Sequence, residues 1–202
     1  MREEFQNFYN EIKESVICRN KELKKIIEKS ENLASKEMLS LVVSKNIIED
    51  VEMVLKLKKI RMLSRYSNMI IRNMCEQVIE YVYFMKNEEL IKQYFGLNIK
   101  EDNEEGELFE RLRQFGGGRF DKKRNIKQMA FNIGEVEKKQ KRDLSLYEIF
   151  SIKSEEVHNS YYNEFLDEVE VVQDGVKEDD DLDYIYLIFI LDCFNKGFEG
   201  EL

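Results

Sequence analysis

Proline is absent from the 202-residue chain, where the average usage of about 5% would give about ten. Glycine is scarce as well, at nine residues. Sandwiches, barrels and doubly wound α/β folds need many turn residues, so this shortage argues against all three. Because proline interrupts helices, a chain of this length without it is expected to be all-helical.

Histidine and paired cysteines are nearly absent too. The chain has a single histidine, His158, and three isolated cysteines, Cys18, Cys75 and Cys193. A typical zinc site needs several His or Cys ligands at short spacing, which this pattern does not offer. We therefore expect no metal, no cofactor and three reduced thiols in the core, as is usual in a cytoplasmic protein.

The sequence also has no long apolar run. The longest uninterrupted one, Tyr184–Leu191, is far short of the roughly 20 residues that a membrane span needs. Met1 is followed by charged residues and an amphipathic pattern, which is not typical of a signal peptide. We expect a soluble, cytoplasmic protein with no membrane contact.

Charge is unevenly distributed along the chain, whose net charge is −9. Residues 119–142 hold nine Lys or Arg against three Asp or Glu, whereas residues 167–202 hold two against twelve. Two interpretations stay open: the basic segment binds phosphate, or the basic and acidic segments pair with each other. The triple glycine Gly116–Gly118 has neither a preceding strand nor a following Lys-Ser/Thr, so it is interpreted as a connector and not as a nucleotide loop.

Apolar residues recur every three or four positions, which predicts amphipathic helices packed in one domain, residues 1–202. Apolar positions cover more than half of the circumference of the stretch 60–94, so it is expected to be the central, most buried helix. Gly134 and Gly197 are predicted to end helices, and Asp181 or Asp183 to cap the last one. The expected fold is an all-α, up-and-down bundle of five to six main helices. Their predicted ranges are 3–30, 36–58, 60–94, 122–133, 144–170 and 182–196.

Tyrosines predict self-association, because aromatic residues are enriched in protein interfaces. We expect a homodimer that uses the edges formed by Tyr81, Tyr83, Tyr161, Tyr162, Tyr184 and Tyr186.

His158 is the first candidate for chemistry. It falls on the apolar stripe of the helix predicted at 144–170, where it is either a buried, hydrogen-bonded core residue or a general acid and base in a cleft. Ser154 lies four residues earlier on the same face, and Asn159 is adjacent.

Arg72 and Glu76, four residues apart in the central helix, form the second candidate. An intrahelical ion pair is the simpler interpretation. If this face meets the helix of His158, Glu76 could orient the imidazole and Arg72 could hold a phosphate. We predict that His158 faces Arg72 and Glu76, with Lys153, Ser154 and Asn159 at the rim of the site.

Three stretches resemble the HEPN superfamily, in particular a helical branch found in bacteria and phages. They are IIRNMCEQVIEYVYFMKN (70–87), RNIKQMAFNIG (124–134) and LYEIFSIKSEEVHNSYY (146–162), and they span residues 60–165 in the order of that family. The resemblance implies an up-and-down bundle that is commonly dimeric. In its catalytic members a metal-independent ribonuclease site forms where two subunits meet.

Those enzymes carry an arginine, four to six residues and then a histidine, the arginine binding phosphate and the histidine moving protons. In this chain the arginine window holds Ser151, Ile152 and Lys153. Lys153 has the spacing, but it lacks the forked donor of arginine and points about 140° away from His158 on an ideal helix. Ribonuclease activity is thus expected only if Arg72 substitutes for the missing arginine.

The sequence supports two functions. The first is a HEPN-like protein that acts on or binds RNA or nucleotides, as a metal-independent ribonuclease in phage defence or a toxin system. The second is a noncatalytic, acidic interaction protein, such as an inhibitor or antitoxin-like protein, whose segment 167–202 binds a basic protein partner.

Overall fold

The structure is a computed structural model that describes residues 2–30, 34–59, 66–91, 125–136, 144–158 and 181–199. All the regular elements in these ranges are helices, which confirms the expected all-α bundle. They are α1 (Arg2–Ile27), α2 (Lys36–Leu57), α3 (Tyr66–Lys86), the short 3-10 helix η2 (Glu88–Leu90), α6 (Ile126–Asn132), α8 (Leu146–His158) and α10 (Asp181–Glu199).

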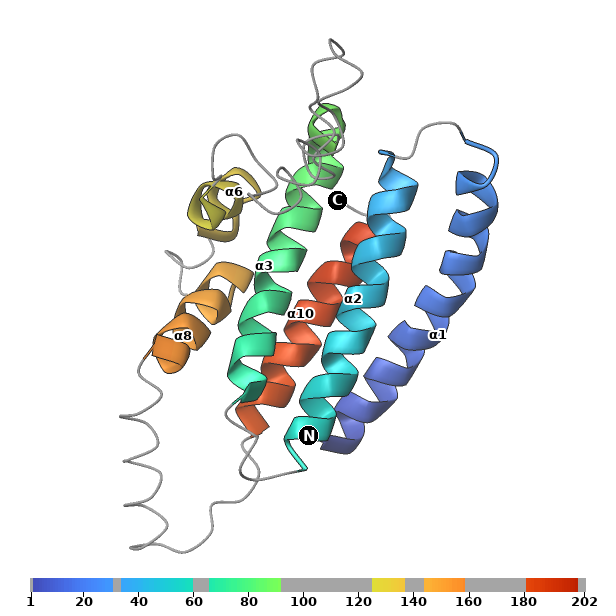
Figure 1. Ribbon diagram of the computed structural model, residues 1–202. Helices are drawn as coiled ribbons and strands as arrows, with labels where there is room; N and C mark the ends of the chain where they lie inside the picture. Colours follow the sequence, from blue (N-terminus) through green and yellow to red (C-terminus); the bar gives the residue numbers. More distant parts are fainter. Residues whose placement is uncertain are drawn as a thin grey trace, which may run out of the picture.

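Figure 1 shows α1, α2, α10 and α3 side by side, with α6 and α8 on the far side of α3 from α1. Helix α3 contacts α2, α10, α8 and α6, and every residue from Val78 to Phe84 is buried. It is therefore the central helix that its broad apolar surface predicts. Tyr81 joins three helices here, because its hydroxyl lies 2.9 Å from Ser40 Oγ on α2 and 3.4 Å from the carbonyl oxygen of Gly197 on α10.

The predicted helix ends are partly right. Gly134 follows α6 with a φ of +87°, a conformation that glycine adopts without the strain of a side chain, and so it ends that helix as expected. Gly197 does not end α10, which continues to Glu199. Asp183 is not a cap either, since α10 begins at Asp181 and the Asp183 carboxylate is turned inward.

The tyrosines that predicted a dimer interface belong mostly to the core of the single chain. Tyr81, Tyr83, Tyr184 and Tyr186 are all buried, and Tyr161 and Tyr162 lie outside the described residues. The predicted aromatic edges are therefore wrong for the four described tyrosines, because α3 and α10 bury them against each other and against neighbouring helices. Within the described ranges, no helix has the length and apolar character that crossing a membrane requires.

Candidate functional site

Arg72 on α3 reaches across to α8. Its Nε donates a hydrogen bond of 2.9 Å to Ser154 Oγ, and its guanidinium carbon lies 4.8 Å from the centre of the Phe150 ring. The Ser154 hydroxyl in turn donates to the carbonyl oxygen of Phe150, 2.6 Å away. Because both the hydroxyl and the aromatic face are fixed by α8, the guanidinium is held in one orientation while its side chain stays 35% exposed. Ser154, which was predicted at the rim of the site, is thus the residue of α8 that contacts Arg72.

Glu76 follows Arg72 by one helical turn. Its Oε2 lies 3.8 Å from Arg72 Nη1, which is an ion-pair distance and beyond a good hydrogen bond. Both side chains are about one third exposed, so solvent screens the pair. The intrahelical pairing expected from the sequence is present in this loose form.

His158 is the last residue of α8, and its side chain is exposed. The prediction that it lies on the apolar stripe is wrong, because the buried positions of α8 are Leu146, Ile149 and Lys153. His158 lies four residues after Ser154, one turn and about 6 Å further along the same face. No hydrogen bond or ion pair joins the imidazole to Arg72 or Glu76 in the described structure. Asn159 lies outside the described residues.

Lys153 does not lie at the rim of this site, as predicted, but is 3% exposed on the buried stripe of α8. Its Nζ donates to Asp183 Oδ1 at 2.7 Å, to Glu156 Oε2 at 2.8 Å and to Asn68 Oδ1 at 3.0 Å. Burial lowers the pKa of Lys153, but the carboxylates of Asp183 and Glu156 raise it more, so the pKa lies above its ordinary value. The ammonium group stays charged inside the bundle because three oxygen acceptors surround it.

Asp183 binds a second lysine that the sequence reasoning missed. Its Oδ2 lies 2.9 Å from Nζ of Lys58, just after α2, and both side chains are under one tenth exposed. Burial raises the pKa of Asp183, but Lys153 and Lys58 outweigh it, so the pKa lies below its ordinary value. We refer to Lys58, Asn68, Lys153, Glu156 and Asp183 as the Asp183 cluster; it joins α2, α3, α8 and α10. One signal in the sequence was available, since Asp183 is a charged residue beside the apolar run Tyr184–Leu191.

Half of the basic segment 119–142 lies within the described residues, but only one of its nine basic residues, Lys127, does. In α6, Asn125 caps the helix by accepting a hydrogen bond from the backbone N–H of Lys127, while Met129 and Ala130 are buried. Lys127 is exposed. The triple glycine Gly116–Gly118 and residues 167–180 of the acidic segment lie outside the described residues.

The described residues contain no group of three His, Cys, Asp or Glu side chains arranged to hold a metal ion. No protein-family model matches the chain, and searches among curated proteins and solved structures returned no match. The case for a function therefore depends on the arrangement of Arg72, Phe150, Ser154 and His158, which we call the α3–α8 site.

Proposed function

We propose that the chain binds the sugar–phosphate backbone of RNA at the α3–α8 site and cleaves it without a metal, as a HEPN-like ribonuclease. The observation that carries this proposal is the bond from Arg72 to Ser154, one helical turn before His158. It supplies, from another helix, the guanidinium that α8 lacks in its own arginine window. A forked guanidinium matches phosphate oxygens better than the point charge of Lys153 would.

The proposed reaction uses two of these side chains. A neutral His158 imidazole removes the proton from a ribose 2′-hydroxyl, and the 2′-oxygen attacks the adjacent phosphorus. The bond from phosphorus to the 5′-oxygen breaks, the leaving oxygen takes a proton from water, and a 2′,3′-cyclic phosphate remains. Arg72 stabilises the negative charge that grows on the phosphate oxygens. Ser154 is a positioning residue, because its hydroxyl is already engaged by Arg72 and the Phe150 carbonyl.

Incubation of a 5′-labelled RNA with the protein in EDTA tests this proposal. Replacing a general base typically lowers a rate by about 10²–10⁴-fold, so His158→Ala should reduce cleavage by at least about 100-fold. Arg72→Lys should weaken RNA binding and cleavage together, because lysine lacks the fork. Because His158 is exposed, its loss should leave the melting temperature nearly unchanged.

Arg19→Ala is the matched control, since it removes an exposed arginine from α1, far along the chain from the site. Cleavage that survives His158→Ala unchanged would come from a contaminating nuclease and would contradict the proposal. RNA that is neither bound nor cleaved by the wild type would contradict it as well.

The alternative function, a noncatalytic interaction protein, is favoured by the net charge of −9, which opposes contact with RNA. In this case a basic protein partner binds the acidic segment 167–202. The RNA experiment separates the two, because this alternative predicts no RNA binding at all.

We also propose that the chain forms a homodimer, as the HEPN resemblance implies. The support no longer comes from the tyrosines but from large apolar side chains that the single chain leaves exposed. Those on α3 are Tyr66, at 42% exposure, and Met69, at 54%, both on the helix that carries Arg72. A second copy placed over this end of α3 would lie close to the α3–α8 site.

A further inference from the structure

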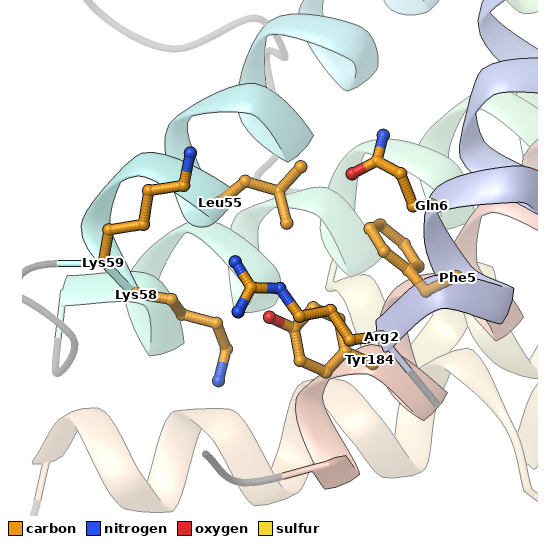
Figure 2. Close-up of a pocket in the computed structure, with 7 residues that line it drawn as sticks. All are labelled: Arg2, Phe5, Gln6, Leu55, Lys58, Lys59 and Tyr184. Carbon is orange, nitrogen blue, oxygen red and sulfur yellow. The ribbon is translucent and has the colours of Figure 1, made fainter.

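A small cavity opens at the other side of the bundle, where the first turns of α1, the end of α2 and the start of α10 meet. Its volume is about 120 Å³. Figure 2 shows the side chains that line it, which are Arg2, Phe5, Gln6, Leu55, Lys58, Lys59 and Tyr184. Three of the seven are cationic and none is acidic. The cavity therefore favours an anion.

The positive charge around this cavity is only partly neutralised. Lys58 has one carboxylate partner, Asp183, which it shares with Lys153. Arg2 and Lys59 are exposed, and neither is in an ion pair with another residue of the described ranges. Among the charged residues that line the cavity, Arg2 and Lys59 therefore keep a positive charge that could attract a bound anion.

Two of the donors lie together. In Figure 2 the Arg2 guanidinium lies beside the Tyr184 hydroxyl, while the ammonium groups of Lys58 and Lys59 point to opposite sides, that of Lys58 being bound to Asp183. Lys59, being exposed, can turn toward an anion at Arg2 because exposed rotamers exchange within nanoseconds. The lining residues Arg2, Phe5 and Gln6 belong to the first turns of α1, whose backbone N–H groups and helix dipole also favour negative charge.

The apolar part of the lining limits what can enter. Phe5 is fully buried, and its ring centre lies 5.3 Å from that of Tyr184, so the two rings pack on each other and leave no slot for a nucleobase. A cavity of about 120 Å³ is also well below the roughly 300 Å³ at which pockets for larger ligands begin.

We propose that this cavity binds a phosphate group, supplied either by inorganic phosphate or by the phosphate of a nucleoside monophosphate whose base stays outside. Arginine, lysine and a tyrosine hydroxyl together donate to several oxygens of one tetrahedral group, which a carboxylate cannot match in number. The site uses none of Arg72, Ser154 and His158, so it does not depend on the proposed ribonuclease activity.

Isothermal titration calorimetry of the full chain with inorganic phosphate, and separately with AMP, tests the proposal. The wild type should bind phosphate saturably with one site per chain. Arg2→Gln combined with Lys59→Gln should weaken binding by at least about tenfold, because it removes two charge-assisted hydrogen-bond donors. AMP that binds as phosphate does would identify the phosphate group alone as the ligand, and tighter binding of AMP would identify the nucleotide as the source.

The control is Lys24→Gln combined with Lys25→Gln, which removes the same charge from the last turn of α1. Lys59→Gln alone is a second variant that should weaken binding without risk to the fold, because the side chain is exposed. Equal weakening in the control pair would show nonspecific attraction and overturn the proposal. Absence of saturable binding to the wild type by both ligands would also overturn it.

Discussion

Asp183 is a buried carboxylate that pairs with two lysines from different parts of the chain. One carboxylate, 5% exposed, binds Nζ of Lys153 from α8 at 2.7 Å and Nζ of Lys58, just after α2, at 2.9 Å. A buried pair contributes little net stability compared with an apolar replacement, but removing one partner leaves an uncompensated charge. Here the loss of a single carboxylate would leave Lys58 without its ion-pair partner and Lys153 with Glu156 alone.

Asp183→Asn should therefore be strongly destabilising, by about 3–5 kcal/mol in the free energy of unfolding, since the amide keeps the shape and removes the charge. Urea titration followed by circular dichroism measures this. As a control, Asp192→Asn disrupts the exposed pair of Asp192 with Lys196 and should cost no more than about 1 kcal/mol. Similar costs for the two variants would show that the Asp183 cluster does not hold the helices together.

The same residue sets an acid limit on stability. The pKa of Asp183 is lowered by folding, so its contribution is fully present above the unfolded pKa of about 4 and is lost as pH falls toward the lower folded value. The pKa of Lys153 is raised, so its contribution is present below the unfolded pKa of about 10 and is lost only at higher pH. The difference in unfolding free energy between wild type and Asp183→Asn should be constant from about pH 5 to 9 and shrink below pH 4. A change centred near neutral pH would contradict this assignment.

At the scale of the helices, the local sequence predicts that a helix is present and roughly where it lies, because periodicity and capping act over a few residues. Helices α1 and α2 end within three residues of their predicted limits, whereas α3 ends at Lys86, eight residues before the predicted end of the central helix at 94. The choice of buried face on α8 was harder. Lys153 is buried and His158 is exposed, because Asp183, about 30 residues later in the chain, makes burial of an ammonium group favourable. Neither the periodicity nor the composition of the sequence predicts that Lys153 pairs with Asp183.

The candidate site was predictable to a similar degree. The sequence named Arg72 and Ser154 as members of one site, but it predicted His158 as the residue facing Arg72, whereas Ser154 is the one that bonds to it. The contact of His158 with Glu76 did not form, because α8 presents Phe150 and Ser154 to α3 and carries His158 beyond them. The spacing of apolar residues predicts which face of a helix is buried. It does not predict how far one helix is shifted along its neighbour, because that shift depends on the side-chain volumes along the whole contact.

Substitutions at Gly134 test the turn that ends α6. Its φ of +87° is unfavourable for residues with a side chain, and a Cβ there would meet nothing within 4 Å. The cost of Gly134→Ala should thus come from the backbone alone, at about 1–2 kcal/mol. Thermal melts of wild type, Gly134→Ala and Gly134→Asn measure it, with asparagine expected between the other two because it tolerates this conformation better. An alanine variant as stable as the wild type would contradict the assigned turn.

At the scale of the whole molecule, light scattering at micromolar concentration tests the proposed dimer. The dimer should scatter with twice the mass of the 24.3 kDa chain, and Met69→Glu should shift it toward the single-chain mass, because a charge would be buried in the interface. Ile26→Glu, on the exposed surface of α1, is the control. A mass of one chain for the wild type would contradict the proposal.

The position of α10 has a consequence for biosynthesis. This helix lies among α1, α2, α3 and α8, yet it follows them all in the chain (Figure 1). At about 5–20 residues per second, translation needs roughly 5–20 s to advance from the end of α3 at Lys86 to the start of α10 at Asp181. During that interval the nascent chain exposes the apolar groove that α10 later fills, including the surface around Phe5 that packs on Tyr184. Chaperones that recognise exposed apolar segments should therefore engage this protein on the ribosome and release it only after its last helix has emerged.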